Sequence, residues 1–143
     1  MDLYKYLFFQ IVDVNDNAPD FMDSCTDLLV PENSELGTIH TFTAVDADEG
    51  RNGQVTFSIS AGNVDNMFTV ELHSGKLTSR PLDRERTAEY TLLITAQDQG
   101  FPLQRTWCNV TVRIIDQNDN SPVWQPPKKL NVSVCFYKFL KVR

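Results

Sequence analysis

The sequence predicts an all-β fold, a seven-stranded Greek-key Ig-like sandwich, on three observations. Apolar and polar residues alternate in short segments such as Val55–Ile59 and Tyr90–Ala96, which is typical of strands buried on one face. Turn-forming residues such as Glu49–Gly53 separate these segments. No helical pattern interrupts them, so about seven short strands occupy roughly 100 residues, as in an antiparallel sandwich.

The strands can be placed in order along the chain. In the second of them, Ile39, Phe42 and Val45 break strict alternation, which predicts a β-bulge. The predicted strands are Leu28–Val30, Thr38–Val45, Val55–Ile59, Phe68–Leu72, a short strand at Leu77, Tyr90–Ala96 and Cys108–Ile114.

One further apolar segment, Leu7–Val12, lies before the predicted sandwich. We interpret it as the last strand of a preceding unit, because the layout of a signal peptide (charge, apolar run, small residues) is missing. No apolar run in the chain approaches the ~20 residues that a membrane-spanning helix needs.

A repeated motif, D-x-N-D-N-x-P, marks both ends of the predicted sandwich. It occurs at Asp13–Pro19 and again 103 residues later at Asp116–Pro122, and each copy leads to an aromatic residue, Phe21 or Trp124. A repeat at the length of a small domain indicates a tandem array. We therefore divide the chain into a last strand and linker (1–17), one complete repeat (18–122) and the start of a following repeat (123–143).

The residue types of this motif indicate a metal site. Asp and Asn offer oxygen ligands, and Ca²⁺ takes about 6–8 oxygens from carboxylates, amides and backbone carbonyls. The alternative is a pair of Asx turns, since Asn and Asp are common turn residues. Two matched copies at domain spacing favour the metal site.

Charge and cysteine content exclude other classes of site. The net charge is −6, and the five Lys/Arg that follow Pro126 leave −11 on the remainder, with 8 Lys/Arg against 19 Asp/Glu. Such an acidic body is unsuited to nucleic acid. The three cysteines lack the spacing of a zinc site. Cys108 faces inward by parity, and two separate thiols are favoured over a Cys25–Cys108 disulfide.

The acidic residues outside the motif fall at strand ends. If successive strands run up and down, these side chains separate into two groups, one at each pole of the domain. Clustered carboxylates repel one another unless a cation neutralises them. One predicted group is Glu32, Asp83, Glu85 and Asp116–Asn120; the other is Asp46, Asp48 and Asp98, beside Asp13–Asn17.

These residues resemble, in order, the motif set of a cadherin extracellular repeat. The motifs are Pro31-Glu32-Asn33, Asp46-x-Asp48, Asp83-Arg84-Glu85, Asp98-x-Gly100 and D-x-N-D-N-x-P. The stretches 46–53 and 96–102 look like the protocadherin and Fat/Dachsous branches. The resemblance covers residues 18–122 and implies Ca²⁺ clusters between successive repeats.

The resemblance also assigns the ligands. Asp13 and Asp116 open their motifs and are not among the assigned ligands. At the C-terminal junction the ligands would be Glu32, Asp83, Glu85, Asn118 and Asp119 through side chains, with Gln117 and Asn120 through backbone carbonyls. At the N-terminal junction they would be Asn15, Asp16, Asp46, Asp48 and Asp98, with backbone oxygens of Val14, Asn17 and Asn52.

Two departures from the family pattern predict weakened Ca²⁺ binding by this chain alone. The preceding repeat is represented only by its last strand, so its own ligands are missing. The position equivalent to Glu32 in the next repeat is Cys135. No adhesive Trp near the N-terminus is evident, and Trp107 and Trp124 are interpreted as packing residues.

The implied function is Ca²⁺-dependent cell–cell adhesion, homophilic or heterophilic, with other cadherin-like repeats as partners in cis or trans. The alternative is a Ca²⁺-stiffened spacer without a recognition surface. The parent protein would be a single-pass protein at the extracellular face of the plasma membrane, and not an enzyme. Sequons at Asn109 and Asn131 fit this location, and by strand parity Asn109 faces solvent.

Overall fold

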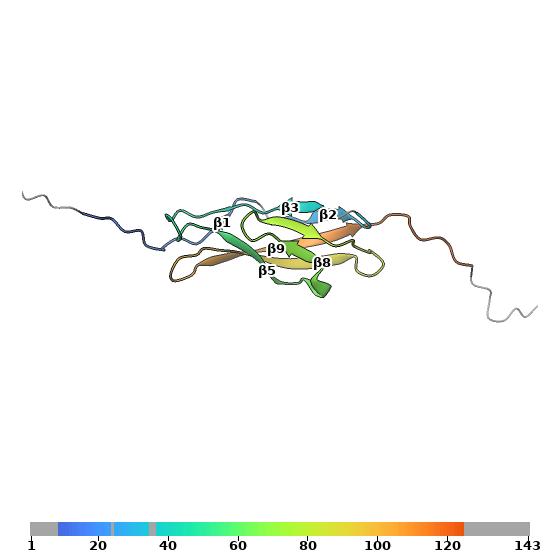
Figure 1. Cartoon of the computed structure of the whole chain (residues 1–143). Helices are drawn as coiled ribbons and strands as arrows, with labels where there is room; N and C mark the ends of the chain where they lie inside the picture. Colours follow the sequence, from blue (N-terminus) through green and yellow to red (C-terminus); the bar gives the residue numbers. More distant parts are fainter. Residues whose placement is uncertain (1–8, 24, 35–36, 125–143) are drawn as a thin grey trace, which may run out of the picture.

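The computed structural model describes residues 9–23, 25–34 and 37–124. They form an elongated β-sandwich whose N-terminal and C-terminal segments leave at opposite poles (Figure 1). The strands are β1 (Asp20–Phe21), β2 (Leu28–Pro31), β3 (Thr38–Thr41), β4 (Ala44–Val45), β5 (Thr56–Ala61), β6 (Phe68–Val70), β7 (Lys76–Ser79), β8 (Glu89–Gln97) and β9 (Arg105–Ile115), with one 3₁₀ turn, η1 (Val64–Asn66).

The two layers are a four-stranded sheet, β2-β9-β8-β5, and a three-stranded sheet, β3-β7-β6, with β1 and β4 as a separate pair. The predicted fold class is confirmed, but one strand pair differs from an antiparallel sandwich. Strand β2 pairs with β9 in parallel, with Leu28 opposite Val112. A parallel pair needs a long connection, and here the connection is nearly the whole repeat.

The strand predicted over Thr38–Val45 is interrupted. The predicted irregularity is confirmed, because the β3–β7 register shifts between Thr38 and His40 and the strand divides into β3 and β4. Thr43 lies in the gap and donates its amide and its hydroxyl to Asp23 Oδ2, both at 2.8 Å. These contacts dock the segment that carries β1, a two-residue strand too short for any periodicity to reveal.

The Asp23 contact predicts a pH-dependent contribution to stability. The hydrogen bonds from the Thr43 side chain and then its amide lower the pKa of the Asp23 carboxyl from 3.8. A lowered folded-state pKa stabilises above the unfolded value and is lost as pH falls through the folded value. Asp23→Asn is therefore expected to melt below wild type at pH 7, and the difference in Tm should shrink below pH 3.8. A constant difference from pH 7 to pH 2 would contradict this assignment.

The strand predicted for Leu7–Val12 is not formed at residues 9–12, which adopt no regular structure in this chain. Phe9, Ile11 and Val12 are exposed. A strand requires a partner for its backbone groups, and none of the described residues pairs with this segment. Residues 7 and 8 lie outside the described part of the chain.

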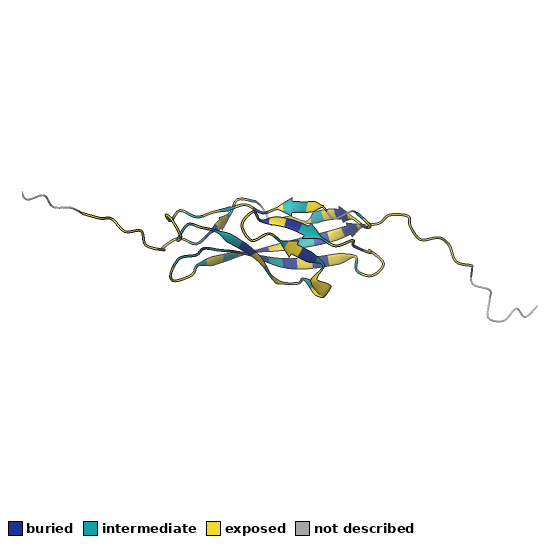
Figure 2. Cartoon of the chain, viewed as in Figure 1, coloured by how far each residue is buried: buried dark blue, intermediate teal, exposed yellow. Residues whose placement is uncertain are grey.

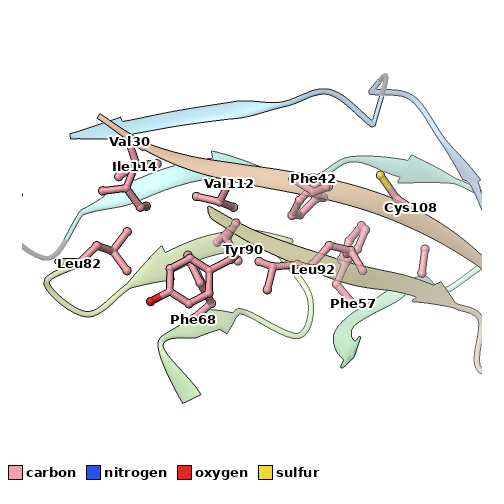
Figure 3. Close-up of a cluster of buried hydrophobic side chains, with 14 residues drawn as sticks. Val30, Phe42, Phe57, Phe68, Leu82, Tyr90, Leu92, Cys108, Val112 and Ile114 are labelled. Atoms are coloured by element: carbon pink, nitrogen blue, oxygen red, sulfur yellow. The ribbon is translucent and has the colours of Figure 1, made fainter. Parts of the chain in front are cut away.

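The hydrophobic core lies between the two main sheets. Buried residues alternate with more exposed ones along β8 and β9 (Figure 2), and the side chains of the buried ones point into the core (Figure 3). Phe68 of β6 meets Tyr90 of β8 edge to face, with ring centroids 5.0 Å apart. The buried hydrophobic residues are Val30, Phe42, Phe57, Phe68, Leu77, Leu82, Tyr90, Leu92, Ile94, Ala96, Cys108, Val110, Val112 and Ile114. These residues form one cluster.

A disulfide joins Cys25 to Cys108, with a Cα–Cα distance of 5.5 Å. The preference for two separate thiols is therefore wrong. Because β2 runs parallel to β9 with Leu28 opposite Val112, the residues that precede β2 lie beside the part of β9 that precedes Val112. Cys135 lies outside the described residues, and within those residues no helix is long and apolar enough to cross a membrane.

Candidate metal centres at the two poles

The C-terminal pole collects acidic side chains from two loops. Glu32 directly follows β2, whereas Asp83 and Glu85 lie between β7 and β8. Each offers one carboxylate oxygen, and these oxygens lie within 4.8 Å of one another. The linker Asp116–Asn120 follows β9 and leaves at the same pole, because β2 and β9 are parallel (Figure 1).

Glu32 is the buried centre of this pole, with no exposed surface. Its Oε1 accepts a hydrogen bond from the backbone amide of Gln117 at 2.7 Å, and its Oε2 accepts one from the backbone amide of Arg84 at 2.9 Å. These two hydrogen bonds, first from Gln117 and then from Arg84, lower the pKa of the Glu32 carboxyl. The side chain is thus a fixed negative charge that ties the loop before β8 to the linker after β9.

Glu85 experiences the opposite effect. A hydrogen bond with its own backbone lowers the pKa of its carboxyl, but burial and the negative charges of Glu32, Asp119 and Asp83 outweigh it, and the pKa is raised. Repulsion among carboxylates destabilises the ionised form. A cation would remove this repulsion, so the donor set fits a hard divalent metal.

The linker is oriented by contacts that the sequence did not reveal. Asn33 donates its side-chain amide to Asp119 Oδ2 at 2.5 Å, and Asn120 donates to Asp119 Oδ1 at 2.8 Å. Asp116 pairs with Arg84 at 3.4 Å. Asn33 has φ of 55°, a backbone conformation that Asn tolerates better than most residues. The presence of Asn at this position is the only feature of the sequence that points to its contact with Asp119. Gln117 and Asn118 are exposed beside them.

At the N-terminal pole, the first linker contacts the loops after β4 and β8. Asn17 donates its backbone amide to Asp48 Oδ2 at 3.0 Å and its side-chain amide to Asp48 Oδ1 at 2.5 Å. The side-chain hydrogen bond is the main cause of the lowered pKa of Asp48. Asp46 Oδ1 accepts the Asp48 amide at 3.0 Å. Asp16 is exposed beside this group and accepts from the Asn17 side chain at 2.9 Å.

Asn15 and Asp98 form the buried part of this pole. Asn15 Nδ2 donates to Asp98 Oδ2 at 2.8 Å and to the Pro102 carbonyl at 2.5 Å. Asn15 is 6% exposed, and its Oδ1 has no hydrogen-bond partner among the described residues. Asp46 Oδ2 is likewise buried without one. Buried oxygens without partners are costly, and they are the atoms that a cation would satisfy.

Two residues of this pole make side-chain contacts that the sequence did not predict. Asn52 donates its side-chain amide to Asp13 Oδ2 at 2.9 Å, and its backbone oxygen stays a predicted ligand. Asp13 also accepts the Glu49 amide at 3.1 Å. Asp13 therefore fixes the linker against the loop after β4, a capping role that the repeated motif alone did not indicate.

Gly100 is required for the close approach of Asn15. A Cβ added at Gly100 would lie 2.4 Å from Asn15 Nδ2 and 2.6 Å from Asn52 Oδ1. Gly100→Ala is expected to displace Asn15 and lower the free energy of unfolding by about 1–2 kcal/mol, as its hydrogen bonds are lost. Urea denaturation of this variant and of Phe101→Ala, an exposed neighbour, measures the difference. Equal midpoints for the two variants would show that Asn15 tolerates the added methyl group.

The predicted packing role of both tryptophans is wrong. Trp107 is 59% exposed and Trp124 is 80% exposed. Trp107 has the outward parity of β9, opposite to that of Cys108. Asn109 shares the outward parity and is exposed, as predicted.

Comparisons with known proteins show which family the chain is similar to. A family model described as "Cadherin domain" matches residues 27–115. The chain is 50% identical over 118 residues to Protein dachsous of Drosophila melanogaster, covering 81% of the chain and 3% of that protein. It is 41% identical over 120 residues to human Protocadherin Fat 4, covering 83% of the chain and 2% of that protein. The chain thus spans a few per cent of the length of these relatives.

Solved structures show the same architecture. One describes Protocadherin Gamma B2 extracellular cadherin domains 3-6, with a TM-score of 0.75, 32% identity, and coverage of 85% of this chain and 30% of that chain. Another is the Protocadherin gammaB7 EC3-6 cis-dimer, with a TM-score of 0.76, 33% identity, and coverage of 84% and 30%.

Proposed function

Since this chain belongs to the cadherin domain family, we propose that its repeat binds Ca²⁺ at both poles and supports Ca²⁺-dependent adhesion in a longer extracellular protein. The observation that carries the proposal is the convergence of Glu32, Asp83 and Glu85 within 4.8 Å beside a linker that Glu32 itself holds. This family consists of adhesion proteins and not of enzymes.

The proposed ligands are the ones that the motifs indicate. Bound Ca²⁺ would supply positive charge between carboxylates that otherwise repel one another. The chain's own contribution is to hold the linkers in place through Glu32 and Asp48. The proposed ligands are Asn15, Asp16, Asn17, Asp46, Asp48, Asn52 and Asp98 at the N-terminal pole, and Glu32, Asp83, Glu85, Gln117, Asn118, Asp119 and Asn120 at the C-terminal pole.

We propose that the complete repeat spans residues 18–122 and that residues 1–17 and 123–143 belong to neighbouring repeats. Its partners would be other cadherin-like repeats in cis or trans, at the extracellular face of the plasma membrane. One similar protein, protocadherin gammaB7, has a cis-dimer structure. The alternative, a spacer stiffened by Ca²⁺, draws support from the linkers leaving at opposite poles, which suits a repeat within a linear array (Figure 1).

Ca²⁺ binding is tested by thermal unfolding with Ca²⁺ and with a chelator. A ligand present at 100 times its dissociation constant stabilises the folded state by about 2.7 kcal/mol. We expect a large rise in Tm when the chain is extended by both neighbouring repeats, and a smaller rise for the 143 residues alone. Asp119→Ala should diminish the rise, whereas Glu71→Gln, an exposed acidic residue away from the linkers, should leave it unchanged. Indifference of the extended chain to Ca²⁺ would remove the metal from the proposed function.

Adhesion and spacing are separated by the oligomeric state of the extended chain in Ca²⁺. Self-association, or attachment to a second cadherin-like protein, supports adhesion through this repeat. A strictly monomeric chain that Ca²⁺ stiffens supports the spacer. Neither result tests Ca²⁺ binding, which the thermal unfolding experiment tests separately.

A further inference from the structure

The outward face of β9 carries an exposed indole beside an acceptor for N-linked sugar. Trp107, Asn109 and Thr111 alternate with the buried residues Cys108 and Val110, so all three lie on the outward side of the sheet. Trp107 is 59% exposed and Asn109 is also exposed. Across the sheet, Leu93 of β8 lies opposite Asn109. Trp-x-Asn-x-Thr is therefore displayed on one surface of a rigid, hydrogen-bonded strand.

The side chain of Asn109 is chemically available. The side chain is exposed, and it makes no hydrogen bond within the described part of the chain. Asn-x-Thr is the acceptor sequence for N-linked oligosaccharide. Its neighbour Cys108 is in the disulfide with Cys25, and disulfides persist in the oxidising compartments where this modification takes place.

Trp107 is placed to receive the sugar. Alternate residues of a strand project from the same face about 6.8 Å apart. The first sugar is attached directly to the Asn side chain and is large enough to cover that distance. The face of an indole is electron-rich and attracts the weakly positive C–H groups of a pyranose ring. Covering the indole would also remove exposed apolar surface from water.

We propose that Asn109 carries an N-linked oligosaccharide whose first N-acetylglucosamine packs on Trp107. In the transfer, Asn109 Nδ2 loses a proton and bonds to C1 of the sugar. The bond from C1 to the pyrophosphate of a lipid-linked oligosaccharide donor breaks, and the lipid pyrophosphate leaves. The sugar then covers the outward face of β8 and β9, so a partner repeat docks elsewhere on the domain. The proposal does not depend on Ca²⁺ binding.

The test uses the full chain secreted from mammalian cells, with Asn131→Gln so that Asn109-Val110-Thr111 is the remaining sequon. Peptide mass spectrometry measures occupancy of Asn109, and Tm is measured for the glycosylated chain trimmed to one sugar. We expect high occupancy and a Tm about 3 °C above that of Asn109→Gln. Trp107→Ala should abolish this increment, whereas Phe101→Ala, which removes another exposed aromatic side chain, should retain it.

A second measurement requires no change at Trp107. In a Trp124→Phe chain, acrylamide quenching reports on Trp107, and the sugar should lower the quenching relative to Asn109→Gln. An unoccupied Asn109, an increment that survives Trp107→Ala, or quenching unchanged by the sugar would each overturn the proposal. An unoccupied Asn109 together with self-association abolished by Trp107→Ala would assign this face to a protein partner instead.

Discussion

Replacing both Cys25 and Cys108 with alanine is expected to lower the free energy of unfolding by about 4 kcal/mol. The disulfide closes a loop with a sequence separation of 83 residues, and its loss restores conformational freedom to the unfolded chain. The shortened Cys108 side chain adds a smaller loss of core packing, because this residue is 1% exposed. Urea denaturation, with Cys135→Ser in every sample, gives the change from the midpoint and slope.

The control for this prediction is the same chain with both cysteines present, measured with and without reductant. Reduction should move its midpoint most of the way to that of the double alanine variant. If oxidised and reduced chains unfolded at the same urea concentration, the disulfide would contribute nothing to stability.

Leu92→Ala is expected to lower the free energy of unfolding by about 2–5 kcal/mol, as large-to-small substitutions in closed cores do. Leu92 is fully buried near the middle of β8, opposite Val110 of β9. Since strands pair on both sides of β8, the backbone has little freedom to close the resulting cavity. The free energy from denaturation or the shift in Tm measures the effect.

Thr91→Ala is the matched control, because Thr91 is the preceding residue and its side chain is exposed. Its expected change is below about 0.5 kcal/mol. Similar losses for Leu92→Ala and Thr91→Ala would mean that the outward and inward faces of β8 are assigned the wrong way round.

The alternation of apolar and polar residues was sufficient to predict which side chains of the long strands face the core. The inward set on β8 and β9, from Tyr90 to Ile114, follows from alternation alone, and so does the exposure of Asn109. The grouping of Glu32 with Asp83 and Glu85 required only the further rule that successive strands along the chain reverse direction. Their role as metal ligands stays a prediction.

The remaining features depend on contacts between distant residues. The parallel pairing of β2 with β9, and the Cys25–Cys108 bond that it makes reachable, follow from no local signal. Parity places Trp107 on the outward side of β9, so its residue type alone was a poor guide to burial. The contact from Asn33 to Asp119 spans 86 residues and depends on a backbone conformation that composition does not report.

The disulfide has a mechanical consequence for a chain pulled from its two ends. Tension that enters at Pro19 passes along the backbone to Cys25, crosses to Cys108 and leaves through Asp116. Residues 26–107 form the loop that the disulfide closes, so they stay outside the covalent path even if the sheets separate. Roughly 280 Å of extended chain is thereby withheld. Under load the domain acts as a short covalent tether, and the distance between Pro19 and Asp116 is limited by covalent bonds rather than by the folded state.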